Sequence, residues 1–285
     1  MMQAQTRRLP LHWIGSATLA MVAFAGNSLL CRLALRGGAI DVASFTAIRL
    51  LAGALTLALL TRCSRRGAAG SRNWGSALAL FGYAAAFSWA YLSLAAGTGA
   101  LLLFGAVQLT MISAGLWQGE RLRPWQWTGF LAAASGLVAL LLPGVHAPSW
   151  SGAGLMLLAG LCWGVYSLRG RRAGGDPLLV TAGNFWRAAL LALLLSAALA
   201  GHAQLGRDGV IAALASGALA SGLGYSIWYS ALPQLSATAA ASLQLTVPVL
   251  AALAAALLLG EPLTLRLVLA AVVVLGGVGL VIRRR

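Results

Sequence analysis

A few polar side chains stand inside long apolar runs of this sequence, and some of them carry a full charge. Arg49 and Arg187 each lie near the middle of such a run, where a charged side chain costs at least about 2.5–3.5 kcal/mol in a bilayer. No acid shares either run, so each guanidinium must meet carbonyls, polar side chains, water or an anionic ligand. Two roles stay open: a bidentate grip on a carboxylate, or an anchor between helices. Arg32 stands near the end of its run and is expected to snorkel to the membrane surface.

Neutral amides and aromatic rings form a second group of candidates. Amides inside apolar helices either hold helices together or line a hydrated cavity. Aromatic faces either pack in the core or stack on an apolar ligand, and Trp163 and Tyr166 are spaced to share one helix face. The candidate substrate-binding residues are Asn27, Arg49, Trp89, Tyr91, Gln108, Trp163, Tyr166, Arg187, Tyr225, Trp228 and Gln244.

The sequence contains no recognisable catalytic or metal-binding motif. It lacks a Gly-x-Ser-x-Gly elbow with a buried His, a His-Glu-x-x-His pair, a Walker loop and a Cys-x-x-Cys pair. We therefore expect no enzyme activity, no cofactor and no metal. The five acids fall in connections or at the ends of apolar runs, so we expect no proton relay through a buried carboxylate. They are Asp41, Glu120, Asp176, Asp208 and Glu261.

The elements that must position these residues are membrane helices. Of the 285 residues, 60% are hydrophobic and 9% charged, with a mean hydropathy of +0.86, whereas a soluble domain carries about 25% charged residues. The apolar runs approach 20 residues, about the length that spans a bilayer core. Ten helices are expected, and Pro248 should kink the ninth. Their ranges are 11–35, 42–62, 74–96, 98–118, 125–142, 151–169, 178–200, 208–232, 236–260 and 264–282.

The net charge of +15 lies mainly in the short connections, so it reports membrane topology rather than nucleic-acid binding. With both termini on one side, fourteen arginines flank the helices there, and only Arg36, Arg207 and Arg266 lie on the other side. Cytoplasmic loops are enriched in Lys and Arg. The sequence therefore predicts that both termini are cytoplasmic, which agrees with an even number of spans.

The two halves of the chain share a pattern. Arg49 recurs as Arg187 at an offset of 138 residues, and Gln108-Leu109-Thr110 recurs as Gln244-Leu245-Thr246 at an offset of 136. This predicts a first repeat over 1–145 and a second over 146–285, each of five helices. Because five is odd, the repeats cross the membrane in opposite senses. Inverted repeats are typical of transporters, whose two halves can open to either side.

Several segments resemble the drug/metabolite transporter superfamily, and its ten-helix, EamA-like branch above all. They are Phe24-Ala25-Gly26-Asn27, Phe45-Thr46-Ala47-Ile48-Arg49-Leu50 and the Gly-Glu-x-Leu turns at Gly119 and Gly260. The sequence departs from the family pattern at Ala25, where a Trp is usual; its repeat partner Trp163 keeps that Trp. The resemblance implies a multi-pass protein of the bacterial inner membrane that exports small metabolites, amino acids and aromatic ones among them.

On this interpretation the partners are a small-molecule substrate and the lipid bilayer, without nucleic acid, and the oligomeric state stays open, a monomer included. The acid-free interior favours a neutral or zwitterionic cargo that moves down its own gradient. Two alternatives remain from the sequence. One is export of another metabolite or flipping of a lipid-linked sugar, and the other is a scaffold without transport activity or a membrane-embedded enzyme.

Overall fold

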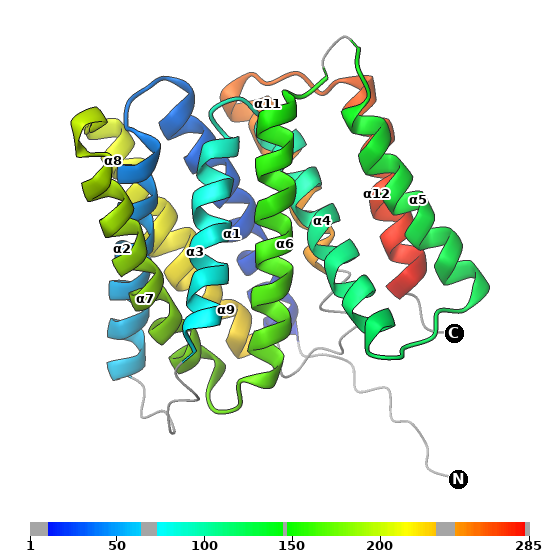
Figure 1. Ribbon diagram of the computed structural model, residues 1–285, viewed down its shortest axis with the longest axis horizontal. Helices are drawn as coiled ribbons and strands as arrows, with labels where there is room; N and C mark the ends of the chain where they lie inside the picture. The colour runs from blue at the N-terminus through cyan, green and yellow to red at the C-terminus, as the bar shows by residue number, and fades with distance from the viewer. Residues whose placement is uncertain (1–10, 64–72, 145–146, 232–242, 283–285) are drawn as a thin grey trace.

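The computed structural model describes residues 11–63, 73–144, 147–231 and 243–282, with side chains from residue 15 onward, and these residues are almost entirely helical (Figure 1). No strand is formed within the described ranges. The all-α class expected from the hydropathy is thus confirmed. The helices are α1 (Leu11–Arg36), α2 (Val42–Cys63), α3 (Trp74–Ala90), α4 (Ala96–Trp117), α5 (Pro124–Leu141), α6 (Trp150–Arg172), α7 (Pro177–Ala198), α8 (Arg207–Ala215), α9 (Gly224–Ala231), α11 (Thr246–Leu259) and α12 (Leu265–Ile282).

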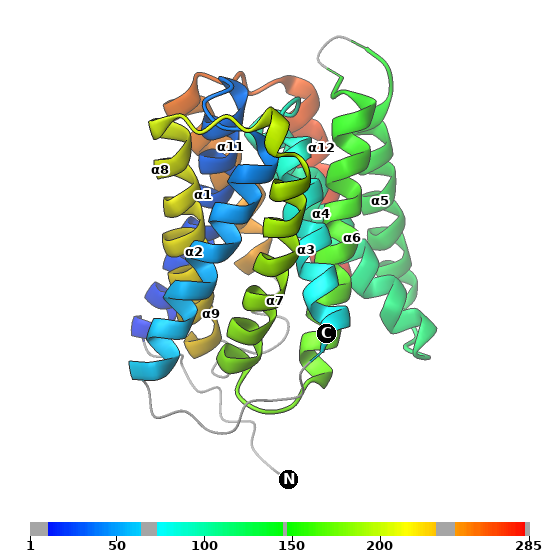
Figure 2. The same cartoon turned by 60° about the vertical axis from the view of Figure 1, so that its left-hand side comes forward.

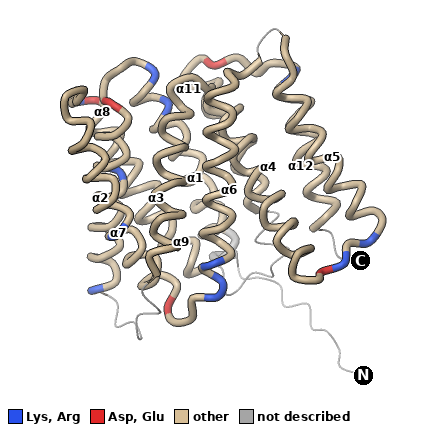
Figure 3. Tube along the Cα trace, viewed as in Figure 1, with Lys and Arg blue, Asp and Glu red and all other residues tan. Residues whose placement is uncertain are grey.

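Seven helical segments in the described part of the chain are long and apolar enough to cross a bilayer. They run side by side, and most charged residues lie at the two ends of the bundle (Figure 3). α1 begins and α12 ends at the same end of the bundle (Figures 1 and 2). All five acids lie at helix ends or in connections, as expected from the sequence.

Two expected helix boundaries need correction. α3 ends at Ala90, six residues before the expected end at 96, and a turn leads into α4. The carbonyls of Tyr91 and Leu92 in this turn accept hydrogen bonds from Arg32 Nη1, at 2.9 and 3.2 Å. The first N–H of α4, on Ala96, donates to Glu261 Oε2 at 2.7 Å. Partners on distant parts of the chain therefore end one helix and begin the next.

The ninth expected helix, 236–260, lies partly outside the described residues, because residues 232–242 are not described. The chain is helical at 243–244, turns at Leu245 and continues as α11. Pro248 lies in the first turn of α11, where its missing N–H removes the bond to the carbonyl of residue 244. The expected disturbance by Pro248 is thus a break in the helix next to Gln244.

Between α8 and α9 the backbone is a π-helix, η2 (Ser216–Leu223), that presses closely on α2. A Cβ added at Gly217 would collide with the backbone carbonyl of Arg49, and one at Gly222 would lie 2.6 Å from Thr56 Cβ. Only glycine permits this approach. π-helical turns are rare and often mark functional sites, and this one faces the centre of the bundle.

The helices of the two halves alternate in the bundle rather than forming separate lobes. α2 packs against α7, α3 against α6, and α5 against α12. α4 contacts both α6 and α11, while α1 contacts α11 and the continuous segment α8–η2–α9. The core is filled chiefly by small side chains and aromatic rings, which lets the helices approach closely.

Candidate functional site

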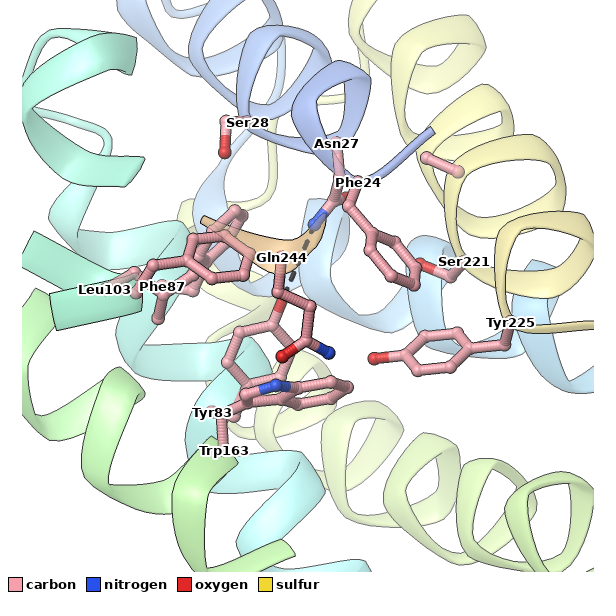
Figure 4. A pocket seen from close by; sticks show the side chains of 12 residues that line it. Phe24, Asn27, Ser28, Tyr83, Phe87, Leu103, Trp163, Ser221, Tyr225 and Gln244 are labelled. Atoms are coloured by element: carbon pink, nitrogen blue, oxygen red, sulfur yellow. Dashed lines mark hydrogen bonds between the residues drawn. The ribbon is translucent and has the colours of Figure 1, made fainter. Parts of the chain in front are cut away.

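A pocket lies at the centre of the bundle, where helices of both halves meet (Figure 4). Its free volume is about 30 Å³, which is room for one or two water molecules. The site is therefore closed in this conformation, and a larger ligand needs the helices to separate. The lining residues are Phe24, Asn27, Ser28, Tyr83, Phe87, Leu103, Phe104, Trp163, Ala220, Ser221, Tyr225 and Gln244.

A buried chain of hydrogen bonds ties four helices together at the wall of this pocket. Ser216 Oγ donates to Asn27 Oδ1 at 2.6 Å, and Asn27 Nδ2 donates to Tyr83 Oη at 3.3 Å (Figure 4). Arg49 Nη2 donates to the same Tyr83 oxygen at 3.0 Å. The four side chains come from α1, α2, α3 and η2, so the network fixes the relative positions of these helices.

Arg49 is the charged group of this network, and it is only 2% exposed. Its guanidinium lies over two rings that line the pocket, 5.3 Å from the Tyr83 centroid and 4.8 Å from the Phe87 centroid. Such stacking on aromatic faces is favourable for a cation. Arg49 Nε and Nη1 are buried and have no hydrogen-bond partner among the described residues. Most buried polar groups are hydrogen-bonded, so these two nitrogens stand out.

Aromatic rings form the opposite wall of the pocket. The Trp163 ring centroid lies 4.8 Å from that of Tyr83 and 5.5 Å from that of Tyr225. Phe24 in turn lies 5.5 Å from Tyr225. These tilted contacts have the spacing that aromatic pairs favour. They present a continuous apolar surface beside the amide and hydroxyl groups.

The structure brings some of the predicted site residues together and separates others. Asn27, Trp163, Tyr225 and Gln244 line the pocket. Three more lie directly behind lining residues. Arg49 lies against Tyr83, Tyr166 lies 5.4 Å from Trp163, and Trp228 lies 6.3 Å from Phe24, the last two measured between ring centroids.

Four predicted residues do not line the pocket: Trp89, Tyr91, Gln108 and Arg187. Trp89 is half-buried against the core, and Gln108 is buried in α4. The Tyr91 hydroxyl donates to the Ala96 carbonyl at 3.2 Å, across the turn between α3 and α4. Arg187 Nη1 donates to the Gly183 carbonyl of its own helix at 2.8 Å, and its guanidinium lies 5.9 Å from the Trp74 ring centroid.

Several lining residues escaped the sequence analysis. Tyr83 and Phe87 are four residues apart on α3, so they share a helix face, but an aromatic pair in an apolar helix is ordinary. Ser28 and Ser221 are small hydroxyls without a motif. Phe24 does precede Asn27 in the segment that carries the family resemblance, and this was the available signal.

Arg32 departs from its expected position. Its guanidinium does not snorkel to the surface; Nε lies 3.0 Å from Glu261 Oε1 in an ion pair whose side chains are 19% and 11% exposed. The tertiary partner outweighs solvation because the turn after α3 adds two carbonyl acceptors for Nη1. Among the described residues no cluster of His, Cys, Asp and Glu could hold a metal ion.

Comparison with known proteins gives this fold and pocket a context. The model of the EamA-like transporter family matches residues 150–283. The uncharacterized protein PA1977 of Pseudomonas aeruginosa is 61% identical over 268 residues, which is 94% of this chain and 93% of that protein. A solved crystal structure with 19% identity covers 95% of this chain and 97% of that chain with a TM-score of 0.68, which shows the fold alone.

The threonine/homoserine exporter RhtA of Escherichia coli is 35% identical over 146 residues, about half of each chain. RhtA of Salmonella typhimurium is 37% identical over 116 residues, which is 40% of this chain and 39% of that protein. Together with the apolar helices, these likenesses make the chain a multi-pass membrane protein and a transporter rather than an enzyme. The chain belongs to the EamA-like transporter family, within the drug/metabolite transporter superfamily.

Proposed function

We propose that the chain exports small neutral or zwitterionic metabolites, and amino acids with apolar or aromatic side chains foremost, by alternating access around the central pocket. The observation that carries this proposal is the pocket itself. It lies between helices of both halves, it combines amide and hydroxyl groups with aromatic faces, and none of its lining residues is an acid. Most ligand sites are mainly apolar with a few placed polar groups, and this pocket has that composition.

The architecture in this proposal is ten transmembrane helices in two inverted repeats, 1–145 and 146–285. The helix pairings support it, because exchanging the repeats maps each pairing onto another. The contact of α3 with α6 becomes that of α8–η2–α9 with α1, and the contact of α4 with α6 becomes that of α11 with α1. The pairs α2–α7, α5–α12 and α4–α11 map onto themselves. The family match over residues 150–283 agrees with the proposed boundary.

The proposed setting is a bacterial inner membrane with both termini in the cytoplasm. The arginine distribution supports this orientation, and the bacterial relatives support the membrane. Substrate contacts are proposed for Asn27, Trp163, Tyr225 and Gln244, with Tyr83 added from the structure. Because the acids lie at helix ends, the proposed movement follows the substrate gradient without protonation of a carboxylate inside the membrane.

Counterflow in proteoliposomes of the purified full chain tests this function. Labelled phenylalanine, leucine and threonine are offered with and without an imposed proton gradient, and protein-free liposomes serve as the control. Saturable exchange of phenylalanine or leucine without a gradient supports the proposal. Exchange of threonine alone replaces the proposed cargo by that of the RhtA relatives, and exchange that needs the gradient overturns uncoupled movement. No exchange of any amino acid overturns the amino-acid assignment.

A further inference from the structure

We infer that the central pocket binds its cargo through a carboxylate, held by Arg49 and Tyr83, and that the amino group of an amino acid is dispensable for binding. This inference rests on the proposed function, because it names the chemical class that the same pocket accepts. It extends to monocarboxylates without any amino group. The argument begins with the unused donors at the pocket wall.

Arg49 keeps a buried positive charge with most of its hydrogen-bonding capacity free. One nitrogen, Nη2, donates to Tyr83, while Nε and Nη1 have no partner in the described part of the chain. The described residues provide no carboxylate for an ion pair with Arg49, since all five acids lie at helix ends or in connections. A buried charge without a counter-charge is costly. An anionic group of a ligand would supply both the missing charge and the missing acceptors.

Tyr83 brings this charge to the surface of the pocket. Its hydroxyl oxygen accepts two hydrogen bonds, from Arg49 Nη2 and Asn27 Nδ2. A phenol oxygen that accepts two bonds has only its own O–H proton left to offer, and no described residue accepts that proton. Donation from the guanidinium also strengthens the hydroxyl as a donor, because linked hydrogen bonds polarise one another. Tyr83 is therefore a charge-assisted donor on the pocket wall.

Nothing comparable awaits an ammonium group. The polar lining residues apart from Tyr83 are Asn27, Ser28, Ser221, Trp163 and Gln244, all neutral, and no lining residue is an acid. An ammonium would thus enter a region that already contains an uncompensated cation. The electrostatics favour ligands with a carboxylate and give the amino group no counter-charge. Loss of the carboxylate should therefore matter more than loss of the amine.

The repeat-related arginine provides an internal comparison. Arg187 lies near the middle of α7, as Arg49 does in α2, but its Nη1 is satisfied by the Gly183 carbonyl and it does not touch the pocket lining. Two related positions have therefore diverged, and only one leaves donors unused at the centre. Arg187→Gln removes the same charge as Arg49→Gln without altering the inferred carboxylate site, so it serves as the matched control.

The test compares three ligands that share one aromatic ring: phenylalanine, phenylalaninamide and 3-phenylpropionate. Each competes with labelled phenylalanine in counterflow by wild type and by the Arg49→Gln, Tyr83→Phe and Arg187→Gln variants. We expect 3-phenylpropionate to compete within a few-fold of phenylalanine, and the amide to be weaker by about tenfold to a hundredfold, as for loss of a hydrogen bond to a charged group. The acid-over-amide preference should collapse in Arg49→Gln, shrink in Tyr83→Phe and persist in Arg187→Gln.

Equal competition by acid and amide in wild type overturns the inference, as does a preference that survives in Tyr83→Phe and in a folded Arg49→Gln. If no amino acid exchanges at all, the proposed function has failed, and ligand-induced stabilisation of the purified protein then decides the inference separately. A melting temperature raised by 3-phenylpropionate but not by 3-phenylpropionamide, in wild type and not in Tyr83→Phe, supports the carboxylate site. Equal shifts, or none, overturn it.

Discussion

Arg32 and Glu261 form a partly buried ion pair, with Nε 3.0 Å from Oε1, that joins α1 to the connection between α11 and α12. The second carboxylate oxygen accepts from the Ala96 N–H at the start of α4, where a negative charge also favours the helix dipole. One carboxylate thus holds three parts of the chain together at the end of the bundle toward which α1 runs. We interpret this arrangement as closure of that end.

Removing either charge should open this end. Each hydrogen bond to a charged group contributes about 1.5–3 kcal/mol, so Arg32→Gln or Glu261→Gln should shift the balance of open and closed forms by about tenfold to a hundredfold. The readout is labelling by a membrane-impermeant maleimide of a cysteine that replaces the pocket residue Ser28, with Cys63 and Cys162 changed to Ser. Arg36→Gln, which removes only an exposed bond to the Leu259 carbonyl, should leave labelling nearly unchanged. Unaltered labelling in both charge variants would contradict this role.

Trp163 should be needed for cargo binding more than other tryptophans. Its ring contacts Tyr83, Tyr166 and Tyr225, so Trp163→Ala removes a large part of the aromatic wall, and we expect the KM for phenylalanine counterflow to rise at least about tenfold. Trp163→Phe should keep most of the affinity. Trp186 on α7 is 39% exposed and outside the pocket, so Trp186→Ala is the control. A similar KM for Trp163→Ala and wild type would argue against contact with the cargo.

Gly217→Ala should destabilise the fold by about 1–3 kcal/mol, as forced overpacking does. The added methyl would collide with the carbonyl of Arg49 and push η2 away from α2. Thermal unfolding in detergent measures the effect. Gly154→Ala is the matched control, since a Cβ at this exposed helical position meets nothing within 4 Å, and it should be neutral or slightly stabilising. Equal melting temperatures for the two variants would refute the close approach.

Acid should weaken the contact between the α1–α2 and α7–α8 connections. Asp41 Oδ1 accepts from Ser44 N–H at 2.9 Å and Oδ2 from Gln204 N–H at 3.0 Å. Burial alone would raise the pKa of this carboxyl, but hydrogen bonds from Ser44, Gln204 and Ala43 outweigh it and lower the pKa below its ordinary value of 3.8. A lowered pKa gives stability that is complete above the ordinary value and is lost as the pH falls through the folded-state value.

We therefore expect the melting temperature of wild type to fall as the pH drops below 3.8, and Asp41→Asn to start lower at neutral pH and to lose part of this dependence. Asp208→Asn, in the first turn of α8, should keep the wild-type profile. If Asp41→Asn showed the full wild-type pH dependence, the hydrogen bonds of Asp41 would contribute nothing to it.

Hydropathy located the helices well because a bilayer core demands long apolar segments whatever their neighbours are. It failed at the end of α3, where Arg32 and Glu261 satisfy backbone groups and neither is near in sequence. Such boundaries depend on tertiary partners, which single-sequence patterns do not contain.

The candidate site divides in the same way. Asn27 and Arg49 could be identified because polar groups are costly inside a membrane, whereas Tyr83 could not, since a tyrosine in an apolar helix is unremarkable until its neighbours are known. The repeat also made Arg49 and Arg187 equivalent in sequence. Their difference depends on which acceptors each guanidinium reaches in three dimensions, the Tyr83 hydroxyl for one and the Gly183 carbonyl for the other.

The π-helix between α8 and α9 also sets the angular register of everything that follows it in that segment. A π-helical turn holds an extra residue relative to an α-helix, and each residue turns an α-helix by about 100°. Deleting one residue from Ser216–Leu223 would let the segment relax to α-helix while barely changing its length or hydropathy. Tyr225 and Trp228 would then rotate by about a quarter turn relative to α1. A homologue with that single gap would still read as the same membrane protein, but with a different set of side chains facing its interior.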